Sequence, residues 1–198
     1  ISMKLLDIPF EHRNWSVGKD FDRIREFNPL GRVPTLVLDG GEALMESAAI
    51  LDHVDELAGP ERALLPRSGA ERRAALRLLA IAIGAAEKGV AQVYEEIFRP
   101  AEKRHQPWVD RCSTQMHGAL AVLDQACANV GGSGWLVGGR MTQADVTTTC
   151  VVTFLTAALA LTPARAPYRA LRAHAARCEA LPAFSSTRAI FSAPATGT

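Results

Sequence analysis

Glu46 and Ser47 are the residues whose types and position best suit the binding of a charged ligand. They follow a short β-prone segment and stand at the beginning of a helical pattern that continues to residue 58. Backbone N–H groups in the first turn of a helix have no intrahelical partners, and the helix dipole favours negative charge there. The Glu-Ser pair therefore predicts an anion-binding site at the start of this helix.

A β-hairpin is expected to position this pair. Pro34 precedes the β-prone run at residues 35–38, and proline suits the entrance of a strand because it cannot donate a ladder hydrogen bond. The Asp-Gly-Gly sequence at residues 39–41 tolerates positive φ, so the chain can turn back into residues 43–45. Residues 28–55 are thus predicted to form a loop, a strand, a turn, a second strand and a helix.

This order of elements, with its Val-Pro and Glu-Ser pairs, resembles the glutathione site of the glutathione S-transferase family. In that family a Val-Pro pair with a cis peptide bond leads into a strand, and a Glu/Gln-Ser pair opens the next helix. The resemblance implies that Val33 binds the cysteinyl part of glutathione through its backbone, that Pro34 is the cis residue, and that Glu46 and Ser47 hold the γ-glutamyl end. Arg32, beside the Val-Pro pair, is expected to approach the glycyl carboxylate.

The residue that would activate the thiol of glutathione is not found in this sequence. Transfer needs a thiolate, which the family stabilises with a Tyr, Ser or Cys just after the first strand or at the start of the first helix. Residues 1–6 read as the end of a helix, and a thioredoxin-like sheet without its first strand would leave unpaired edges in its interior. We therefore expect roughly fifteen residues, with the first strand and the start of the first helix, to precede Ile1. The identity of the catalytic residue is unknown from this sequence.

Second-substrate contacts in the family come largely from the first long helix of the helical domain. The candidates here are Tyr94 and Phe98, spaced i and i+4, with Val90 and Glu87 on earlier turns. The alternative interpretation assigns Phe98 to the core of the helical bundle and makes Glu87 a surface carboxylate.

From residue 69 onward the pattern is helical. An apolar stripe at helical spacing predicts one long helix, and a second stripe at residues 109–127 predicts another that packs antiparallel to it. The members of the first stripe are Leu76, Leu79, Ile83, Ala86, Val90, Val93 or Tyr94, and Ile97. Thr142 and Asp145 form a Thr-x-x-Asp capping box, which family members carry at the start of the bundle's buried helix, and we assign it a structural role.

The predicted fold is an α/β thioredoxin-like N-terminal domain followed by an all-α C-terminal helical bundle. The N-terminal domain spans residues 1–60 and is incomplete at its N-terminus, residues 61–68 form a linker, and the helical domain spans residues 69–198. Within the first domain, the alternation of apolar and polar residues at 10–15 predicts a strand, and residues 21–27 a short helix.

Composition and spacing argue against several other functions. A net charge of +1 gives no electrostatic reason to expect nucleic-acid binding. Four cysteines and five histidines show no metal-ligand spacing, so we expect buried reduced thiols and no metal site. The uncharged run at residues 146–164 carries six threonines and begins with the capping box, which favours a buried helix over a membrane span. No signal peptide is visible, and we expect a cytoplasmic protein.

The resemblance implies a detoxifying transferase that conjugates reduced glutathione to a small hydrophobic electrophile and forms a homodimer. Two alternatives remain open. One is another glutathione-dependent enzyme of the same fold, namely an isomerase, a dehalogenase or a thiol-disulfide exchange enzyme, and a cysteine at the activating position would favour exchange. The other is a non-catalytic binding module.

Overall fold

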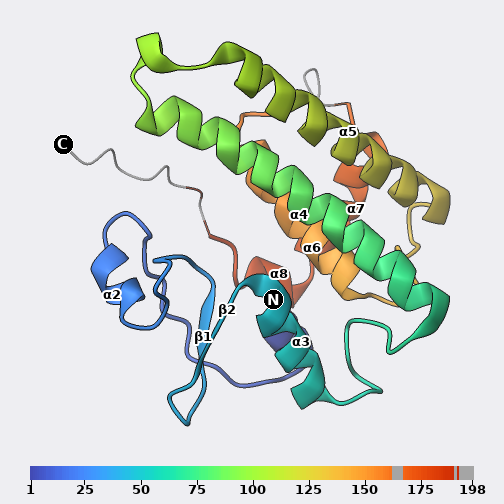
Figure 1. Ribbon diagram of the computed structural model, residues 1–198. Coiled ribbons are helices and arrows are strands. Elements are labelled where there is room, and N and C mark those ends of the chain that lie inside the picture. Colours follow the sequence, from blue (N-terminus) through green and yellow to red (C-terminus); the bar gives the residue numbers. More distant parts are fainter. Residues whose placement is uncertain (162–166, 190, 192–198) are drawn as a thin grey trace. The chain divides into compact units, whose positions relative to one another are not determined.

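The structure is a computed structural model that describes residues 1–161, 167–189 and 191 (Figure 1). The chain forms two compact units, one of residues 2–63 and one that begins at Leu64. The first contains a small sheet and short helices, and the second is helical. This arrangement confirms an α/β N-terminal part followed by an all-α part.

Residues 2–63 contain the predicted hairpin. Strands β1 (Thr35–Val37) and β2 (Ala43–Met45) pair antiparallel, with Leu36 opposite Leu44. The turn closes through the N–H of Leu38, which donates to the carbonyl of Glu42 at 2.8 Å. Helix α3 (Ser47–Ala58) follows β2 directly (Figure 1). The order of elements expected for residues 28–55 is therefore confirmed.

The strand predicted at residues 10–15 is wrong, because this segment has no regular secondary structure. It lies between helices α1 (Ser2–Leu5) and α2 (Phe21–Arg25). Alternating polarity gives a segment two faces, but a strand also needs a neighbour to pair its N–H and C=O groups. In the described part of the chain the sheet consists of β1 and β2 alone.

The second unit is built around two long helices. Its elements are α4 (Gly69–Phe98), the 3₁₀ turn η1 (Ala101–Lys103), α5 (Gln106–Val130), α6 (Gln143–Ala158), α7 (Arg169–Glu179) and α8 (Pro182–Ser185). Helix α4 packs against α5 and α6, and α7 packs against α5 and α6. The two longest helices, α4 and α5, run alongside each other as expected (Figure 1).

The buried face of α4 differs from the predicted stripe. Leu76, a predicted member, is 43% exposed, and the face turned inward carries mainly small residues. Its buried apolar positions are Ala75, Leu78, Ala82, Ala85, Gly89 and Val93. Small side chains let neighbouring helices approach closely: a Cβ atom on Gly89 would lie 2.1 Å from Cδ2 of Leu155 on α6. Close helix packing thus selects the small residues for burial and leaves bulkier ones on the flanks.

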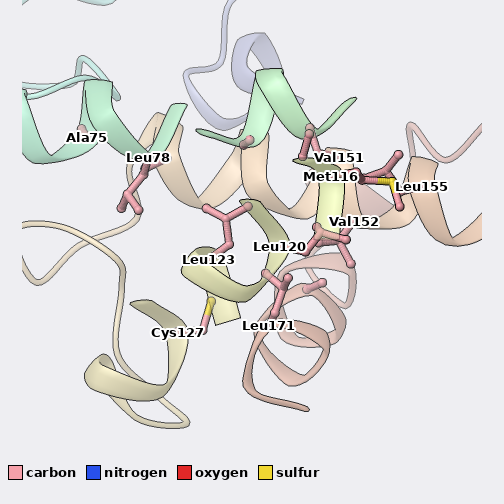
Figure 2. Close-up of a cluster of buried hydrophobic side chains, with 14 of the residues drawn as sticks. Ala75, Leu78, Met116, Leu120, Leu123, Cys127, Val151, Val152, Leu155 and Leu171 are labelled. Atoms are coloured by element: carbon pink, nitrogen blue, oxygen red, sulfur yellow. The ribbon is translucent and has the colours of Figure 1, made fainter. Parts of the chain in front are cut away.

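The stripe on α5 is confirmed. Cys112, Met116, Leu120, Leu123 and Cys127 are all buried. Figure 2 shows Met116, Leu120, Leu123 and Cys127 of this row beside side chains of α4, α6 and α7 in one apolar cluster. The cluster fixes the register of the helices that carry the candidate residues of this unit.

Three of the four cysteines are buried free thiols as expected, but Cys150 on α6 is exposed. Within the described ranges, no helix combines the length and the apolar character that a membrane span requires.

Candidate functional site

The loop that leads into β1 has an unusual backbone. The Val33–Pro34 peptide bond is cis, as expected, and the Val33 side chain is exposed. Gly31 has a φ of +61°, and a Cβ atom there would lie 2.2 Å from the ring of Phe21. Glycine is therefore required by both the backbone conformation and the space available.

Asn28, to which the sequence alone assigned no role, organises this loop. It is fully buried, and its Nδ2 donates to the carbonyl of Arg32 at 2.9 Å and to the Thr35 hydroxyl at 3.2 Å. Its Oδ1 accepts from the N–H of Leu30 at 3.0 Å. One side chain thus fixes the backbone on both sides of Val33 and Pro34. The sequence signal that could have identified it is an Asn-Pro-x-Gly pattern between a helix and a strand.

We expect Asn28→Ala to lower the affinity for glutathione about tenfold and the free energy of unfolding by about 1–3 kcal/mol, since buried polar groups lose their partners. Isothermal titration with glutathione and urea denaturation measure the two effects. Asn14→Ala, at an exposed position of the same unit, is the matched control and should change neither. Equal results for the two variants would contradict the assigned role of Asn28.

Glu46 links β2 to α3 in a conformation that non-glycine residues rarely adopt. Its φ is +68° and its ψ is 133°, and the helix begins at the next residue, Ser47. Such a backbone costs about 1–3 kcal/mol and persists only where the surroundings impose it, often at a ligand site. The conformation therefore agrees with a binding role for this residue.

The structure brings Arg32 and Glu46 together. Nη1 of Arg32 lies 3.1 Å from Oε1 of Glu46, and both side chains are more than half exposed. An exposed pair of this kind contributes only about 0–1 kcal/mol to stability, so a ligand with its own charges can replace it at little cost. The predicted glutathione-binding residues therefore share one surface of residues 2–63, with a cation and an anion side by side.

The candidate second-substrate residues lie in the other unit, on α4. The rings of Tyr94 and Phe98 meet edge to face with centroids 5.1 Å apart, and they are 47% and 52% exposed. The alternative that placed Phe98 in the bundle core is therefore wrong. Glu87 is exposed and Val90 is half-buried on earlier turns of the helix. We call Tyr94 and Phe98 the aromatic pair.

The capping box at the start of α6 is formed and is part of a larger buried network. Oδ2 of Asp145 accepts from the Thr142 N–H at 2.8 Å and from its hydroxyl at 3.0 Å. Oδ1 accepts from the N–H of Leu136 at 2.9 Å and lies 3.2 Å from Nε2 of His174. Asp145 and His174 are both buried, so the box ties α6 to α7 and to the preceding loop. His174 is the member of this network that sequence reasoning missed.

Hydrogen bonds between Asp145 and His174 favour the charged form of each. Burial opposes ionisation of Asp145, but hydrogen bonds from His174, Leu136 and Thr142 keep the pKa of this carboxyl below its ordinary value. Burial likewise disfavours the imidazolium, but hydrogen bonds with Asp145 and Cys178 raise the pKa of His174 to about 9. Nη2 of Arg177 lies 3.2 Å from Nδ1 of the ring, and because a guanidinium can only donate, this contact opposes protonation of Nδ1.

Stability should depend on pH through this pair. The pKa of His174 rises from 6.5 to about 9 on folding, so its contribution is fully present below pH 6.5 and is lost as pH rises towards 9. The loss should be on the order of 3 kcal/mol. The pKa of Asp145 is lowered, so its contribution is present above the ordinary value of 3.8 and is lost as pH falls below it. Urea denaturation of the native protein and His174→Gln between pH 6 and 10 tests this, since the variant should show a flatter alkaline profile.

Two cavities of the helical unit lie away from these residues. One of about 360 Å³ is lined largely by residues of α6 and by the chain around α8, among them Thr149, Phe154, Phe184 and Phe191. None of the predicted site residues lines it. Among the residues described, no three His, Cys, Asp or Glu side chains are grouped so that they could hold a metal ion.

Comparison with family models accounts for most of the chain. The model of the glutathione S-transferase N-terminal domain matches residues 1–62, and that of the C-terminal domain matches residues 89–182. The chain belongs to the glutathione S-transferase family. Its thioredoxin-like N-terminal domain and helical C-terminal domain are those of the family, as the Val-Pro, Glu-Ser and capping-box residues predicted.

Two proteins are similar to the chain in sequence. The chain is 31% identical over 143 residues to the uncharacterized GST-like protein YibF of Escherichia coli, which is 71% of this chain and 65% of that one. This chain is also 37% identical, over 82 residues or 39% of its own length, to probable maleylacetoacetate isomerase 2 of Drosophila melanogaster. The chain thus spans 65% and 35% of the lengths of these two relatives.

A glutathione S-transferase of Methylobacterium radiotolerans, solved in complex with glutathione sulfonate, has a similar structure. The two superpose with a TM-score of 0.82 at 28% identity, over 100% of this chain and 88% of the other. The similarity therefore extends over both domains.

Proposed function

We propose that this glutathione S-transferase binds reduced glutathione and conjugates it to a small hydrophobic electrophile. The observation that carries the proposal is the left-handed backbone of Glu46, immediately before α3 and beside Arg32. A binding module without glutathione would have no need of this strained residue. The glutathione sulfonate bound to the Methylobacterium relative supports the same ligand class.

The charges of the site suit the ends of glutathione. The γ-glutamyl end carries a carboxylate and an ammonium group. The carboxylate meets Ser47 and the free N–H groups at the start of α3, where the helix dipole is favourable. The ammonium pairs with the carboxylate of Glu46, in place of Arg32. Arg32, once released, is available to the glycyl carboxylate at the other end.

The cysteinyl part pairs with the backbone of Val33. The cis bond to Pro34 and the hydrogen bonds of Asn28 hold this backbone in place, so the tripeptide adopts an extended conformation along the loop. Because the thiol of glutathione is then held in place, its reaction with a bound electrophile no longer requires two free molecules to meet in the right orientation.

The electrophile lies against the aromatic pair, with Val90 and Glu87 completing the surface. Half-exposed aromatic rings bind flat apolar molecules through area burial and edge or face contacts. The reaction then forms a bond from the glutathione sulfur to the electrophilic carbon, and the leaving group departs with the electron pair.

We assign activation of the thiol to none of the chain's own cysteines. Burial, with nearby Asp124 and Asp145, raises the pKa of Cys127 to about 12. Cys150 lies on α6, outside the unit that carries the predicted glutathione-binding residues. Cys112 and Cys178 are buried. The family resemblance implies a Tyr, Ser or Cys as the activating group. We also propose that the protein is a cytoplasmic homodimer.

Isothermal titration with reduced glutathione, followed by a conjugation assay with a chlorinated nitroaromatic electrophile, tests the proposal. We expect binding and a rate that depends on both substrates. No detectable binding at millimolar glutathione would overturn it. Size-exclusion chromatography with light scattering tests the homodimer separately.

An isomerase is the second candidate, because part of the chain is 37% identical to a probable maleylacetoacetate isomerase. The two activities differ in their use of glutathione. A transferase consumes it in proportion to product, whereas an isomerase regenerates it in each cycle. Measuring free thiol during turnover of an unsaturated dicarboxylic acid therefore distinguishes them.

A further inference from the structure

Glu95 is a charged residue inside the helical unit, next to the aromatic pair in sequence. Its side chain is only 8% exposed, unlike that of its neighbour Glu96, which is exposed. A buried carboxylate is costly unless it is paired and hydrogen-bonded. Its partners therefore indicate what the residue does.

Both carboxylate oxygens of Glu95 are engaged at the end of α4. Oε2 lies 2.8 Å from Nε of Arg99, one turn later, and Oε1 accepts from the backbone N–H of His105 at 2.9 Å. His105 is the residue that precedes α5. One side chain thus joins the last turn of α4 to the residue immediately before the next long helix.

Arg104 closes the same connection from the other side. Its Nη2 donates to the carbonyl of Glu96 at 2.6 Å, and its Nε donates to the carbonyl of Arg99 at 3.2 Å. Carbonyls at the end of a helix lack intrahelical partners, and a cation there also interacts favourably with the helix dipole. We call Glu95, Arg99, Arg104 and His105 the clasp.

The clasp encloses the helical turns that carry the aromatic pair. Tyr94 immediately precedes Glu95, and Phe98 immediately precedes Arg99. The last residues of a helix fray unless side chains bind their free carbonyls. Without the clasp, the two rings would lose their fixed edge-to-face arrangement because Phe98 is the terminal residue of α4.

We propose that Glu95 is a positioning residue for the second substrate: its buried carboxylate holds the end of α4 against the start of α5 and so fixes the aromatic pair. This inference rests on the proposed function, since it assigns the aromatic pair to the electrophile. Glu95 itself makes no contact with either substrate.

The experiment compares Glu95→Gln with Glu96→Gln, the same substitution at the adjacent exposed residue. In Glu95→Gln we expect kcat/KM for the electrophile to fall roughly tenfold or more, with most of the change in its KM, because displaced binding groups are costly. The glutathione Kd should stay unchanged. Hydrogen exchange of the backbone amides at residues 94–99, 105, 106 and 108 should accelerate, and Glu96→Gln should match the native protein throughout.

A purely structural role would lower the active fraction and reduce turnover for both substrates alike, without raising the electrophile KM; that result overturns the proposal. So does unchanged hydrogen exchange. If Glu95→Gln does not fold, Arg99→Gln removes the same ion pair through its exposed partner. This variant should likewise raise the KM for the electrophile and leave the glutathione Kd unchanged. If the native protein conjugates no electrophile, the proposed function fails, and the exchange data still decide whether the clasp holds this helix end.

Discussion

Replacing Asp145 by alanine is expected to lower the free energy of unfolding by about 3–5 kcal/mol, the largest effect of any single substitution considered for this protein. The carboxylate is fully buried and serves four groups: two of Thr142, the N–H of Leu136 and the ring of His174. Alanine would leave the imidazolium buried without its counter-ion. It would also leave the N–H groups of Leu136 and Thr142 without this acceptor.

Urea denaturation followed by circular dichroism measures this loss. Asp110→Ala, at an exposed position of α5, is the control and should change stability by less than about 0.5 kcal/mol. Asp145→Asn should fall in between, because an amide keeps one acceptor oxygen but carries no charge. The role is structural, so the glutathione Kd of the folded fraction should stay at its native value. A loss below about 1 kcal/mol for Asp145→Ala would show that the network is not coupled as described.

Glu46→Gly should stabilise the fold and weaken glutathione binding at the same time. Glycine adopts a φ of +68° without the steric cost that a side chain brings, so unfolding should require about 1 kcal/mol more in the variant. The same change removes the carboxylate proposed to bind the ammonium group of glutathione. Loss of a charged hydrogen bond of about 1.5–3 kcal/mol corresponds to a Kd raised roughly tenfold to a hundredfold.

The opposite signs of the two effects make this test specific. Glu42→Gly, in the hairpin turn, is the matched control: its residue has an ordinary φ, so stability should fall slightly and binding should not change. A glutathione Kd unaffected by Glu46→Gly would remove Glu46 from the site. Glu46→Gln, which keeps the backbone strain and loses only the charge, separates the two contributions.

The features that the sequence predicted correctly depend on residues close together in the chain. Pro34, the Asp-Gly-Gly turn and the Glu-Ser pair act within a few residues of their own backbone, and they defined the hairpin and the start of α3. Thr142 and Asp145 likewise form a box across three residues. Local backbone chemistry is sufficient for such elements, and with the family resemblance it was also sufficient to predict the fold.

The features that sequence reasoning missed depend on which surfaces meet. Residues 10–15 alternate in polarity but have no neighbouring strand among the described residues, and α4 buries its small residues because α6 approaches Gly89 closely. The pairing of Asp145 with His174 joins residues far apart in the sequence.

The candidate site shows the same division. Residue types and spacing predicted an anion site at Glu46 and Ser47, and the family resemblance implied that Arg32, Val33, Pro34, Glu46 and Ser47 bind glutathione. Only the tertiary structure placed Arg32 against Glu46, buried Asn28 beneath the loop and brought His105 to Glu95. These contacts join separate segments, and their distances follow from packing, which no local pattern encodes.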